Sequence, residues 1–258
     1  MELANRAAVV TGGSRGIGRA IALALAKRGA NVVVAARNAD SVAQVADEIR
    51  ALGRRAAAVA CDVTSPASIS RLSQVARDEL GAIDILVNNA GIASSAPIKT
   101  LTLEDWNRVM AVNATGTFLC TQAFLAGMAE RRWGRVVNVA SITSRMGSPY
   151  IAAYTASKHA VLGFTRVVAA EYAARNVTAN AVCPGYVNTD MTTDSVARVM
   201  AKTGLSSEAA LEAILKTAGQ KRLIEPEEVA FVVASLCAED AGGINGQAIV
   251  IDGGGLLA

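Results

Sequence analysis

A tyrosine and a lysine are spaced so that they can share a proton-transfer site. In the run Tyr154-Thr155-Ala156-Ser157-Lys158 they stand four positions apart, which places both on one face of a helix. An unperturbed tyrosine has a pKa near ~10, and a neighbouring ammonium favours the phenolate and lowers that pKa. We therefore expect Tyr154 to act as a general acid or base near neutral pH. A tyrosine and a lysine at this spacing also recur often by chance, so the pair alone is a weak indication of a catalytic site.

A glycine-rich loop follows the first apolar run of the chain. The loop reads T-G-G-S-R-G-I-G and leads into a helical pattern. Glycines let a backbone approach a pyrophosphate, and the following helix offers N–H groups and the positive end of its dipole. The spacing G-x-x-x-G-x-G differs from G-x-G-x-x-G, and such a loop can also be a plain turn. We interpret it as a dinucleotide site, in which the expected contacts are Gly12, Ser14, Arg15, Gly16, Ile17 and Gly18.

The end of the second apolar run bears on the choice of dinucleotide. NAD sites usually place an acidic residue there to hold the ribose 2′-OH. Here the run ends in Arg37 and Asn38, with no carboxylate. Arg37 can pair bidentately with a 2′-phosphate, and Arg15 would add a second positive charge. We predict that NADP(H) is preferred and that NAD(H) remains possible; the alternative is that both arginines are solvated surface residues.

The surrounding sequence alternates strands with helices. Its strands are continuous apolar runs, which is typical of a parallel sheet covered on both faces. They are predicted at Ala7–Thr11, Val32–Ala36, Ala56–Cys61, Ile83–Asn88, Val136–Ala140, Val177–Val182 and Ala248–Ile251. The longer helices are predicted at Gly16–Gly29, Asp40–Leu52, Pro66–Leu80, Asn113–Arg131, Ala153–Arg175 and Pro226–Ala238, and a shorter one opens at Thr102.

This pattern predicts an α/β fold, a doubly wound seven-stranded parallel sheet (a Rossmann fold) with helices on both faces. We expect one domain over residues 1–258, with the strand order 3-2-1-4-5-6-7. The cleft should lie at the carboxyl ends of the strands, where the order reverses between the first and fourth. An insertion at about residues 188–223 should carry one or two short helices and cover the substrate.

Composition excludes several classes of protein. The chain of 258 residues is 52% hydrophobic and 18% charged, with a net charge of +3 spread along it, which disfavours disorder and nucleic-acid binding. Its four cysteines, Cys61, Cys120, Cys183 and Cys237, form no CxxC pair, and the single histidine is His159, so no metal site is expected. We see no signal peptide and no apolar run near the ~20 residues of a membrane span, and expect a cytoplasmic protein.

The motifs together resemble the short-chain dehydrogenase/reductase family over essentially the whole chain. The matching stretches are Thr11–Gly18, Asp62-Val63, Asn88-Asn89-Ala90-Gly91, Asn113, Ser141, Tyr154…Lys158 and Pro184-Gly185…Thr189. The resemblance implies that Tyr154 exchanges a proton with the substrate oxygen, which Ser141 holds. Lys158 would lower the pKa of the tyrosine and bind the nicotinamide ribose, and Asn113 would anchor a water that links Lys158 to solvent.

The resemblance also implies the remaining walls of the cofactor cleft. In addition to Tyr154 and Lys158, they are Asp62, Val63, Asn89, Ala90, Gly91, Pro184, Gly185, Val187 and Thr189. Local alternatives stay open, because Ser141 can be a turn residue and Asn113 a helix N-cap. His159 points about 100° away from Lys158 on the helix, and we expect no catalytic role for it.

The expected substrate-binding residues are Ser141, Thr143, Tyr154 and Tyr186. The segments around them, Ile142–Tyr150 and the insertion, are largely apolar, which favours a hydrophobic ketone or the acyl part of a thioester. Within the family the chain resembles 3-oxoacyl-thioester and polyketide ketoreductases and 3-hydroxybutyrate dehydrogenases. The last hold a free carboxylate with polar and cationic residues, where this chain has Ala93, Thr143, Ile151 and Tyr186. A small keto acid would bury an unpaired carboxylate here, at a high cost in free energy.

We therefore expect an NADP(H)-dependent oxidoreductase that reduces a β-ketoacyl thioester or ester, or a bulky ketone, to a secondary alcohol. Three alternatives remain: an NAD-dependent hydroxyacyl or secondary-alcohol dehydrogenase working oxidatively, a non-catalytic NADP(H)-binding regulator, and a subunit active only with a partner. We also expect a homotetramer, because the helix after Tyr154 carries Ala156, Ala160, Gly163 and Val167 on one side. The resemblance points to pairing through this helix and through Asn113–Arg131.

Overall fold

A single seven-stranded sheet organises the part of the chain that the structure describes. The computed structural model describes residues 2–216 and 218–256, so that residues 1, 217, 257 and 258 of the predicted domain lie outside it. All strand pairs are parallel, and their order is β3-β2-β1-β4-β5-β6-β7, which confirms the predicted fold class and strand order. The strands are β1 Ala7–Thr11, β2 Asn31–Ala36, β3 Ala56–Ala60, β4 Ile85–Asn88, β5 Gly134–Val139, β6 Val177–Pro184 and β7 Ala248–Ile251.

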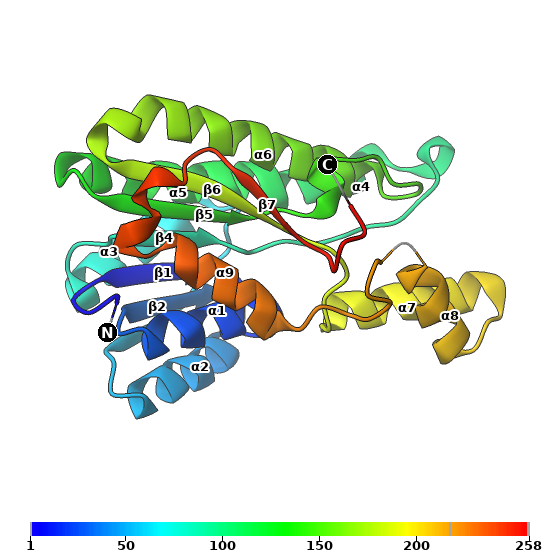
Figure 1. Cartoon of the computed structure of the whole chain (residues 1–258), viewed down its shortest axis with the longest axis horizontal. Helices are drawn as coiled ribbons and strands as arrows, with labels where there is room; N and C mark the ends of the chain where they lie inside the picture. Colours follow the sequence, from blue (N-terminus) through cyan, green and yellow to red (C-terminus); the bar gives the residue numbers. More distant parts are fainter. Residues whose placement is uncertain (1, 217, 257–258) are drawn as a thin grey trace.

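Helices cover both faces of this sheet (Figure 1). One face carries α1, α2 and α9, and the other carries α3, α5 and α6. These helices are α1 Gly16–Lys27, α2 Ala39–Ala51, α3 Pro66–Leu80, α5 Gly116–Glu130, α6 Ala152–Tyr172 and α9 Pro226–Leu236. Parallel strands buried on both sides must be apolar throughout, which is why the continuous runs of valine and alanine predicted them correctly.

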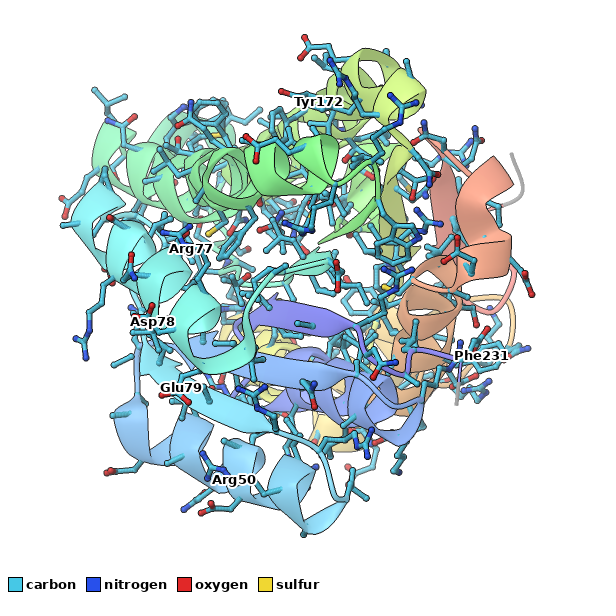
Figure 2. All side chains as sticks on the ribbon, turned by 90° about the vertical axis from the view of Figure 1, so that its left-hand side faces the viewer. Arg50, Arg77, Asp78, Glu79, Tyr172 and Phe231 are labelled. Atoms are coloured by element: carbon cyan, nitrogen blue, oxygen red, sulfur yellow. The ribbon has the colours of Figure 1, made fainter. Side chains whose placement is uncertain are left out.

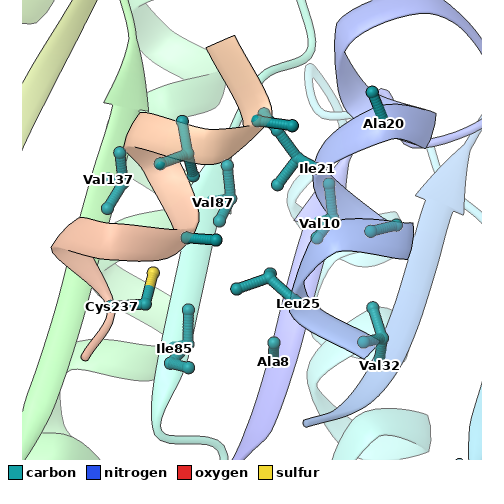
Figure 3. Close-up of a cluster of buried hydrophobic side chains, with 14 of the residues drawn as sticks. Ala8, Val10, Ala20, Ile21, Leu25, Val32, Ile85, Val87, Val137 and Cys237 are labelled. Carbon is teal, nitrogen blue, oxygen red and sulfur yellow. The ribbon is translucent and has the colours of Figure 1, made fainter. Parts of the chain in front are cut away.

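Successive residues of each strand enter the two different cores. Figure 3 shows Ile21 and Leu25 of α1 beside Val10 of β1 and Val87 of β4, all fully buried. The neighbouring Val9 is also fully buried but belongs to the cluster on the opposite face. Each buried aliphatic side chain of this size stabilises the fold by about 1.5–3 kcal/mol relative to exposure. This aliphatic packing fixes the strand ends on which the site is built.

The outer sides of the helices carry the charged residues. In Figure 2, Arg50 on α2 and Asp78 and Glu79 on α3 point away from the sheet. On α3 the buried side chains, which include Ile69 and Leu72, fall at the helical spacing that faces the core. The charged face therefore marks solvent rather than a ligand surface.

One helix differs from its prediction at a position that matters for the site. The predicted helix Asn113–Arg131 is continuous with a preceding one: α4 spans Leu103–Met110, a single π-helical turn spans Ala111–Thr115, and α5 follows. A π turn is often found at functional sites, because the extra residue re-aims one side chain. Here the turn contains Asn113, which is therefore not the N-cap that the sequence left open.

Smaller differences concern the ends of elements. β4 begins at Ile85, two residues later than predicted, and β6 continues to Pro184, two residues longer. The long helix ends at Tyr172 and is followed by a 3₁₀ turn, Ala173–Arg175, and by Asn176 in the left-handed region at φ 55°. Asn tolerates that conformation, which lets the chain reverse into β6.

The insertion forms two helices, as predicted. α7 spans Asp190–Thr203 and α8 spans Ser207–Leu215, and Gly204 joins them at φ 72°. We call Asp190–Leu215 the arm. Figure 1 shows the arm reaching beyond the body formed by the sheet and its covering helices.

Candidate active site

Lys158 lies buried on α6, one helical turn after Tyr154. Its ammonium donates a hydrogen bond to the carbonyl oxygen of Val139, at 2.7 Å, and its Nζ lies 5.7 Å from the centre of the Tyr154 ring. Burial lowers the pKa of Lys158 from its ordinary 10.5 to about 8, because the charged form loses its hydration. The predicted proximity of tyrosine and lysine is thus present, on one face of one helix.

The pKa of Tyr154 moves in the direction opposite to the one we expected. Desolvation by burial raises it, a hydrogen bond with Ser141 lowers it less, and the neighbouring Tyr186 and Cys183 raise it further. The expected lowering of the pKa of Tyr154 by Lys158 is therefore wrong for this structure, where burial is the largest influence on that pKa and raises it. The consequence is a phenol that keeps its proton at neutral pH and suits the role of an acid.

Ser141 stands two residues beyond Val139, the last residue of β5. Its Oγ accepts a hydrogen bond from the backbone N–H of Thr143, at 3.2 Å, and so caps the 3₁₀ turn Ile142–Ser144. Ser141 is therefore a turn residue, as the sequence allowed. Its hydrogen bond holds the hydroxyl in place, and the hydroxyl can still bind a substrate oxygen. Thr143 is also buried, and its Oγ1 has no hydrogen-bond partner among the described residues.

Asn113 ties the π turn to the loop after β4. Its Oδ1 accepts from the N–H of Ile92 and its Nδ2 donates to the carbonyl of Ile92, both at 2.9 Å. Nδ2 also donates to Ser157 Oγ at 3.0 Å, and Ser157 in turn donates to the carbonyl of Tyr154 at 2.7 Å. A Cβ on Gly91 would lie 3.4 Å from Asn113 Oδ1 and 3.7 Å from Lys158 Nζ, so these groups share one small space.

The glycine loop forms a cradle that larger residues would fill. Gly12 has φ +63°, and a Cβ there would lie 2.8 Å from the Cα of Ala90. A Cβ on Gly18 would lie 2.2 Å from the carbonyl oxygen of Gly12. At the start of α1, the Arg15 side chain makes no capping hydrogen bond and the first turn has no acidic residue. A close backbone approach and uncapped N–H groups fit the pyrophosphate of a dinucleotide.

The other predicted cofactor residues surround this cradle. They follow the carboxyl ends of five strands: Gly12 to Gly18 after β1, Arg37 after β2, Asp62 and Val63 after β3, Asn89 to Gly91 after β4, and Pro184 to Thr189 at the end of β6. Asn89 closes the cradle, since its Nδ2 donates to the carbonyls of Thr11 and Gly12 at 3.1 and 3.0 Å. These residues lie along the carboxyl ends of the strands, where the strand order reverses between β1 and β4.

The two arginines assigned to a 2′-phosphate lie in different surroundings. Arg37 is exposed, while its neighbour Asn38 caps α2 by accepting from the N–H of Ser41. Hydrogen bonds from Thr64 lower the pKa of Asp62, and the positive charge of Arg37 lowers it further. Arg15, by contrast, forms an ion pair of 2.7 Å with Asp190 on the first turn of α7.

Three side chains at this end of the sheet were missed by sequence reasoning. Ser157 was recognisable, because it stands between the tyrosine and the lysine of the motif. Cys183 is buried, 3.4 Å from Ser144 Oγ, and burial raises the pKa of its thiol. Asp252 accepts hydrogen bonds from the N–H groups of three residues that follow β7, and its Cβ packs against Gly185. Neither of the last two stands in a motif that would have revealed it.

Two further features of the described residues bear on function. No group of three or more His, Cys, Asp or Glu side chains in residues 2–216 and 218–256 could hold a metal ion. The stretch Leu103–Glu130 is long and apolar enough, by length and composition alone, to cross a membrane. In the structure, 44% of its most apolar window is buried inside the protein. Phe124 and Met128 of this stretch belong to the core, so the helix serves as a packing element here.

Tyr154 and Lys158 stand one helical turn apart, and Tyr154 is hydrogen-bonded to Ser141. Together with a glycine loop that fits a pyrophosphate, this arrangement is typical of an oxidoreductase that works with a nicotinamide cofactor. Known proteins agree. The model of the short chain dehydrogenase family matches residues 6–199. The chain is 41% identical to a 3-oxoacyl-[acyl-carrier-protein] reductase of Synechocystis sp. over 254 residues, 98% of this chain and 97% of that protein.

The chain is also similar to a dehydrogenase and to a ketoreductase of known structure. It is 36% identical to a D-beta-hydroxybutyrate dehydrogenase of Rhizobium meliloti over 252 residues, 96% of this chain and 98% of the other. A variant of actinorhodin polyketide ketoreductase, solved with NADPH, superposes with a TM-score of 0.93 at 37% identity and covers 96% of both chains. The chain belongs to the short-chain dehydrogenase family and interconverts a ketone and a secondary alcohol with NAD(P)(H).

Proposed function

We propose that the protein is an NADP(H)-dependent ketoreductase that acts on a β-ketoacyl thioester or ester, or on a bulky hydrophobic ketone. The observation that carries the reaction type is the pair formed by Tyr154 and Lys158, one a phenol that keeps its proton and the other a buried amine with a pKa of about 8. Tyr154 is hydrogen-bonded to Ser141, and Lys158 Nζ would lie 3.7 Å from a Cβ on Gly91, one of the residues that we assign to the cofactor.

Each residue of the site has a role that follows from its contacts. The bound nicotinamide supplies the hydride. Tyr154 donates its phenolic proton to the substrate oxygen as charge develops there, and the Ser141 hydroxyl donates a hydrogen bond to the same atom. Lys158, charged below about pH 8, stabilises the phenolate that remains. Asn113, through Ser157, holds the first turn of α6 against the loop after β4.

Support for NADP(H) comes from the end of β2. Arg37 is the charged side chain there, it is exposed, and Asn38 is occupied in capping α2. No carboxylate stands at the position that would hold a ribose 2′-OH. A 2′-phosphate would meet the guanidinium of Arg37 as a bidentate partner.

Support for the substrate class comes from exposed apolar side chains in the segments that follow Ser141 and β6. Met146, Tyr186 and Met191 are about 40% exposed, so hydrophobic surface is available to an acyl chain. The positions that correspond to a carboxylate pocket hold Ala93, Thr143, Ile151 and Tyr186, none of which is cationic. This favours reduction of an ester or thioester over oxidation of 3-hydroxybutyrate, the second candidate that the Rhizobium relative suggests.

A steady-state assay tests both parts of the proposal. The purified protein is given NADPH or NADH with acetoacetyl thioester, a β-keto ester, a hydrophobic ketone or acetoacetate. We expect the highest kcat/KM for NADPH with one of the first three substrates. Turnover of acetoacetate alone would refute the substrate class, and equal kcat/KM for the two cofactors would refute the preference.

A charge reversal assigns the preference to Arg37. Arg37→Asp should lower kcat/KM for NADPH by about tenfold or more and leave NADH nearly unchanged, because it removes one charge and adds a repulsive one. Arg71→Asp, an exposed arginine on α3, is the matched control for net charge. An equal loss of NADPH efficiency in both variants would show that net charge, not position, decides.

We further propose a homotetramer in the cytoplasm. Phe118 on α5 and Val167 on α6 are 42% and 51% exposed, and Phe118 stacks edge-on against Phe164 of α6 at 5.9 Å. An apolar face of this kind is costly to expose, and a second copy would cover it. Four free, buried cysteines suit a reducing compartment. Light scattering at micromolar concentration tests the assembly, and a stable monomer would overturn it.

A further inference from the structure

The start of the arm is joined to the glycine loop by two contacts. The guanidinium of Arg15 lies 2.7 Å from a carboxylate oxygen of Asp190, and both side chains are largely exposed, at 78% and 67%. Beside this pair, the methyl group of Thr189 lies against Gly16, so that a Cβ on Gly16 would meet it at 3.1 Å. The arm therefore begins directly over the loop that we assign to the cofactor phosphates.

The loop that carries Arg15 also lies against the end of β2. The loop touches β2 where the N–H of Gly13 donates to the carbonyl of Ala35, at 3.2 Å. Two residues further along each segment stand Arg15 and Arg37. The flexible guanidinium of Arg15 can thus serve either the 2′-phosphate that we expect beside Arg37 or the carboxylate of Asp190.

We propose that Asp190 is a determinant of cofactor choice, because it competes with the 2′-phosphate of NADP(H) for Arg15. The inference rests on the proposed function, in which both arginines attract that phosphate. In the structure Arg15 is already paired with an anion. NADP(H) must exchange this partner for its phosphate, whereas NAD(H) has no second phosphate and requires no exchange. Asp190 therefore moderates a preference that Arg15 and Arg37 create.

Electrostatics predicts which part of cofactor affinity Asp190 controls. A carboxylate at this place repels the pyrophosphate of both cofactors, so its removal should tighten both to a similar extent. The additional effect on NADPH arises only through Arg15. The ratio of the dissociation constants of NADH and NADPH isolates this effect, since the common repulsion cancels in it. A merely structural role of Asp190 in seating the arm would leave the ratio unchanged.

A double-mutant cycle on cofactor binding tests the proposal without use of activity. Dissociation constants of NADPH and NADH are measured by nucleotide fluorescence for the wild-type protein, Asp190→Asn, Arg15→Gln and the double variant. We expect Asp190→Asn to raise the preference for NADPH by about threefold, the scale of one exposed ion pair. In the Arg15→Gln background the same change should leave the preference unaltered. Asp194→Asn, an exposed aspartate on the same helix, should not change the ratio.

The outcomes separate this proposal from the one on which it rests. Equal affinity of the wild-type protein for both cofactors would refute the proposed NADP(H) preference, and the change of ratio in Asp190→Asn would still decide the role of Asp190. An unchanged ratio in Asp190→Asn would overturn the inference. So would a change that persists when Arg15 is replaced, or one that Asp194→Asn reproduces. Asp190→Glu, which keeps the charge, should behave like the wild-type protein.

Discussion

At the amino ends of β4 and β5 buried polar groups are bonded to one another, whereas at the carboxyl ends several have no partner. The guanidinium of Arg135, 1% exposed, donates to the carbonyls of Gly134, Asn176, Ala238 and Glu239 at 2.9 to 3.5 Å. At the other end, hydroxyl oxygens of Ser94, Thr143 and Thr155 are buried without a hydrogen-bond partner among the described residues. The amino ends have one such atom among the described residues, Thr178 Oγ1, opposite Arg135 in the strand register.

Aromatic contacts complete the amino end. The ring of Trp133 lies between two guanidinium groups, that of Arg6 at 3.5 Å from its centre and that of Arg135 at 4.4 Å. Its Nε1 donates to Glu239 at 2.8 Å, and Glu239 also pairs with Arg6 at 2.9 Å. Every charge in this cluster has an opposite charge, an aromatic face or a carbonyl beside it, so the cluster stabilises the fold and offers nothing to a ligand.

The carboxyl ends of the strands carry hydrogen-bonding groups that a ligand can satisfy. Lys158 has one hydrogen bond among the described residues, although an ammonium carries three donors. The N-terminus of α1 has no side-chain cap. Incompletely satisfied groups reduce stability, and proteins retain them where a ligand completes them. Within one sheet, the polar groups that stabilise the fold therefore gather at the amino ends of the strands, and those available to a ligand gather at the carboxyl ends.

The largest expected effect is the loss of turnover in Tyr154→Phe. Only the hydroxyl is lost, and it supplies the proton, so we expect kcat to fall by about 10²–10⁴-fold. Cofactor affinity and Tm should change little, because the ring and its packing remain. Steady-state kinetics with nucleotide-binding titrations check this. Retention of most of the activity would break the assignment of the carboxyl end as the reactive one.

The same kind of change at the amino end should affect stability alone. Arg135→Met removes the donors of four backbone carbonyls from a buried place, and we expect it to lower the free energy of unfolding by about 3 kcal/mol. The kcat/KM of the folded protein should be unchanged. Urea denaturation and steady-state kinetics on one preparation test this, and a loss of activity below the unfolding transition would contradict the comparison.

Lys158→Met, in contrast to Arg135→Met, should raise the free energy of unfolding. The buried ammonium has a pKa of about 8 in the folded protein, against 10.5 in an unfolded chain. Below pH 8 it is charged in both states and its burial is costly, so the methionine variant should be more stable, by about 2 kcal/mol at pH 7, and inactive. Between pH 8 and 10.5 the unfolded wild-type chain binds more protons, and its stability rises with pH. The advantage of the variant should therefore shrink across this window.

The control for this titration is Lys158→Arg, whose guanidinium keeps its charge. Its stability should show no rise of this origin between pH 8 and 10.5. Urea denaturation at pH 7, 8, 9 and 10 provides the measurement. A wild-type protein that is more stable than Lys158→Met at pH 7 would show that the ammonium is fully solvated by its surroundings, contrary to its single bond.

Some features of the fold and of the site could be predicted from the sequence, and others could not. The fold was predictable, because continuous apolar strands and capped helices are local signals that agree with one another. The places of Ser141, Tyr154 and Lys158 followed from strand ends and helical spacing. The sequence predicted a second helix beginning at Asn113, but it gave no signal that a π turn at Ala111–Thr115 would join the two helices. Bonds from Asn113 to the backbone of Ile92, 21 positions away, accompany the extra residue.

Two electrostatic features were beyond the sequence for a similar reason. The pKa direction of Tyr154 depends on how deeply the folded chain buries it, which a motif does not encode. The pairing of Arg15 with Asp190 joins residues 175 positions apart across a surface that exists only after folding. The contacts of Trp133 and Arg135 with Glu239 likewise join residues more than 100 positions apart in the chain.

The smallest expected effect comes from Glu239→Gln at the amino end. The glutamate side chain is 63% exposed, so its pair with Arg6 is screened by water, and we expect a loss of about 0.5 kcal/mol in the free energy of unfolding. The amide oxygen of glutamine can still accept from Trp133 Nε1, which keeps the ring in place. Salt at about 1 M shortens the Debye length to ~3 Å and should abolish the difference between variant and wild type. Urea denaturation at low and high salt measures it, with kcat/KM expected to stay constant. A loss as large as that of Arg135→Met would show that the stability of this end resides in the exposed ion pair rather than in the buried guanidinium and its carbonyl partners.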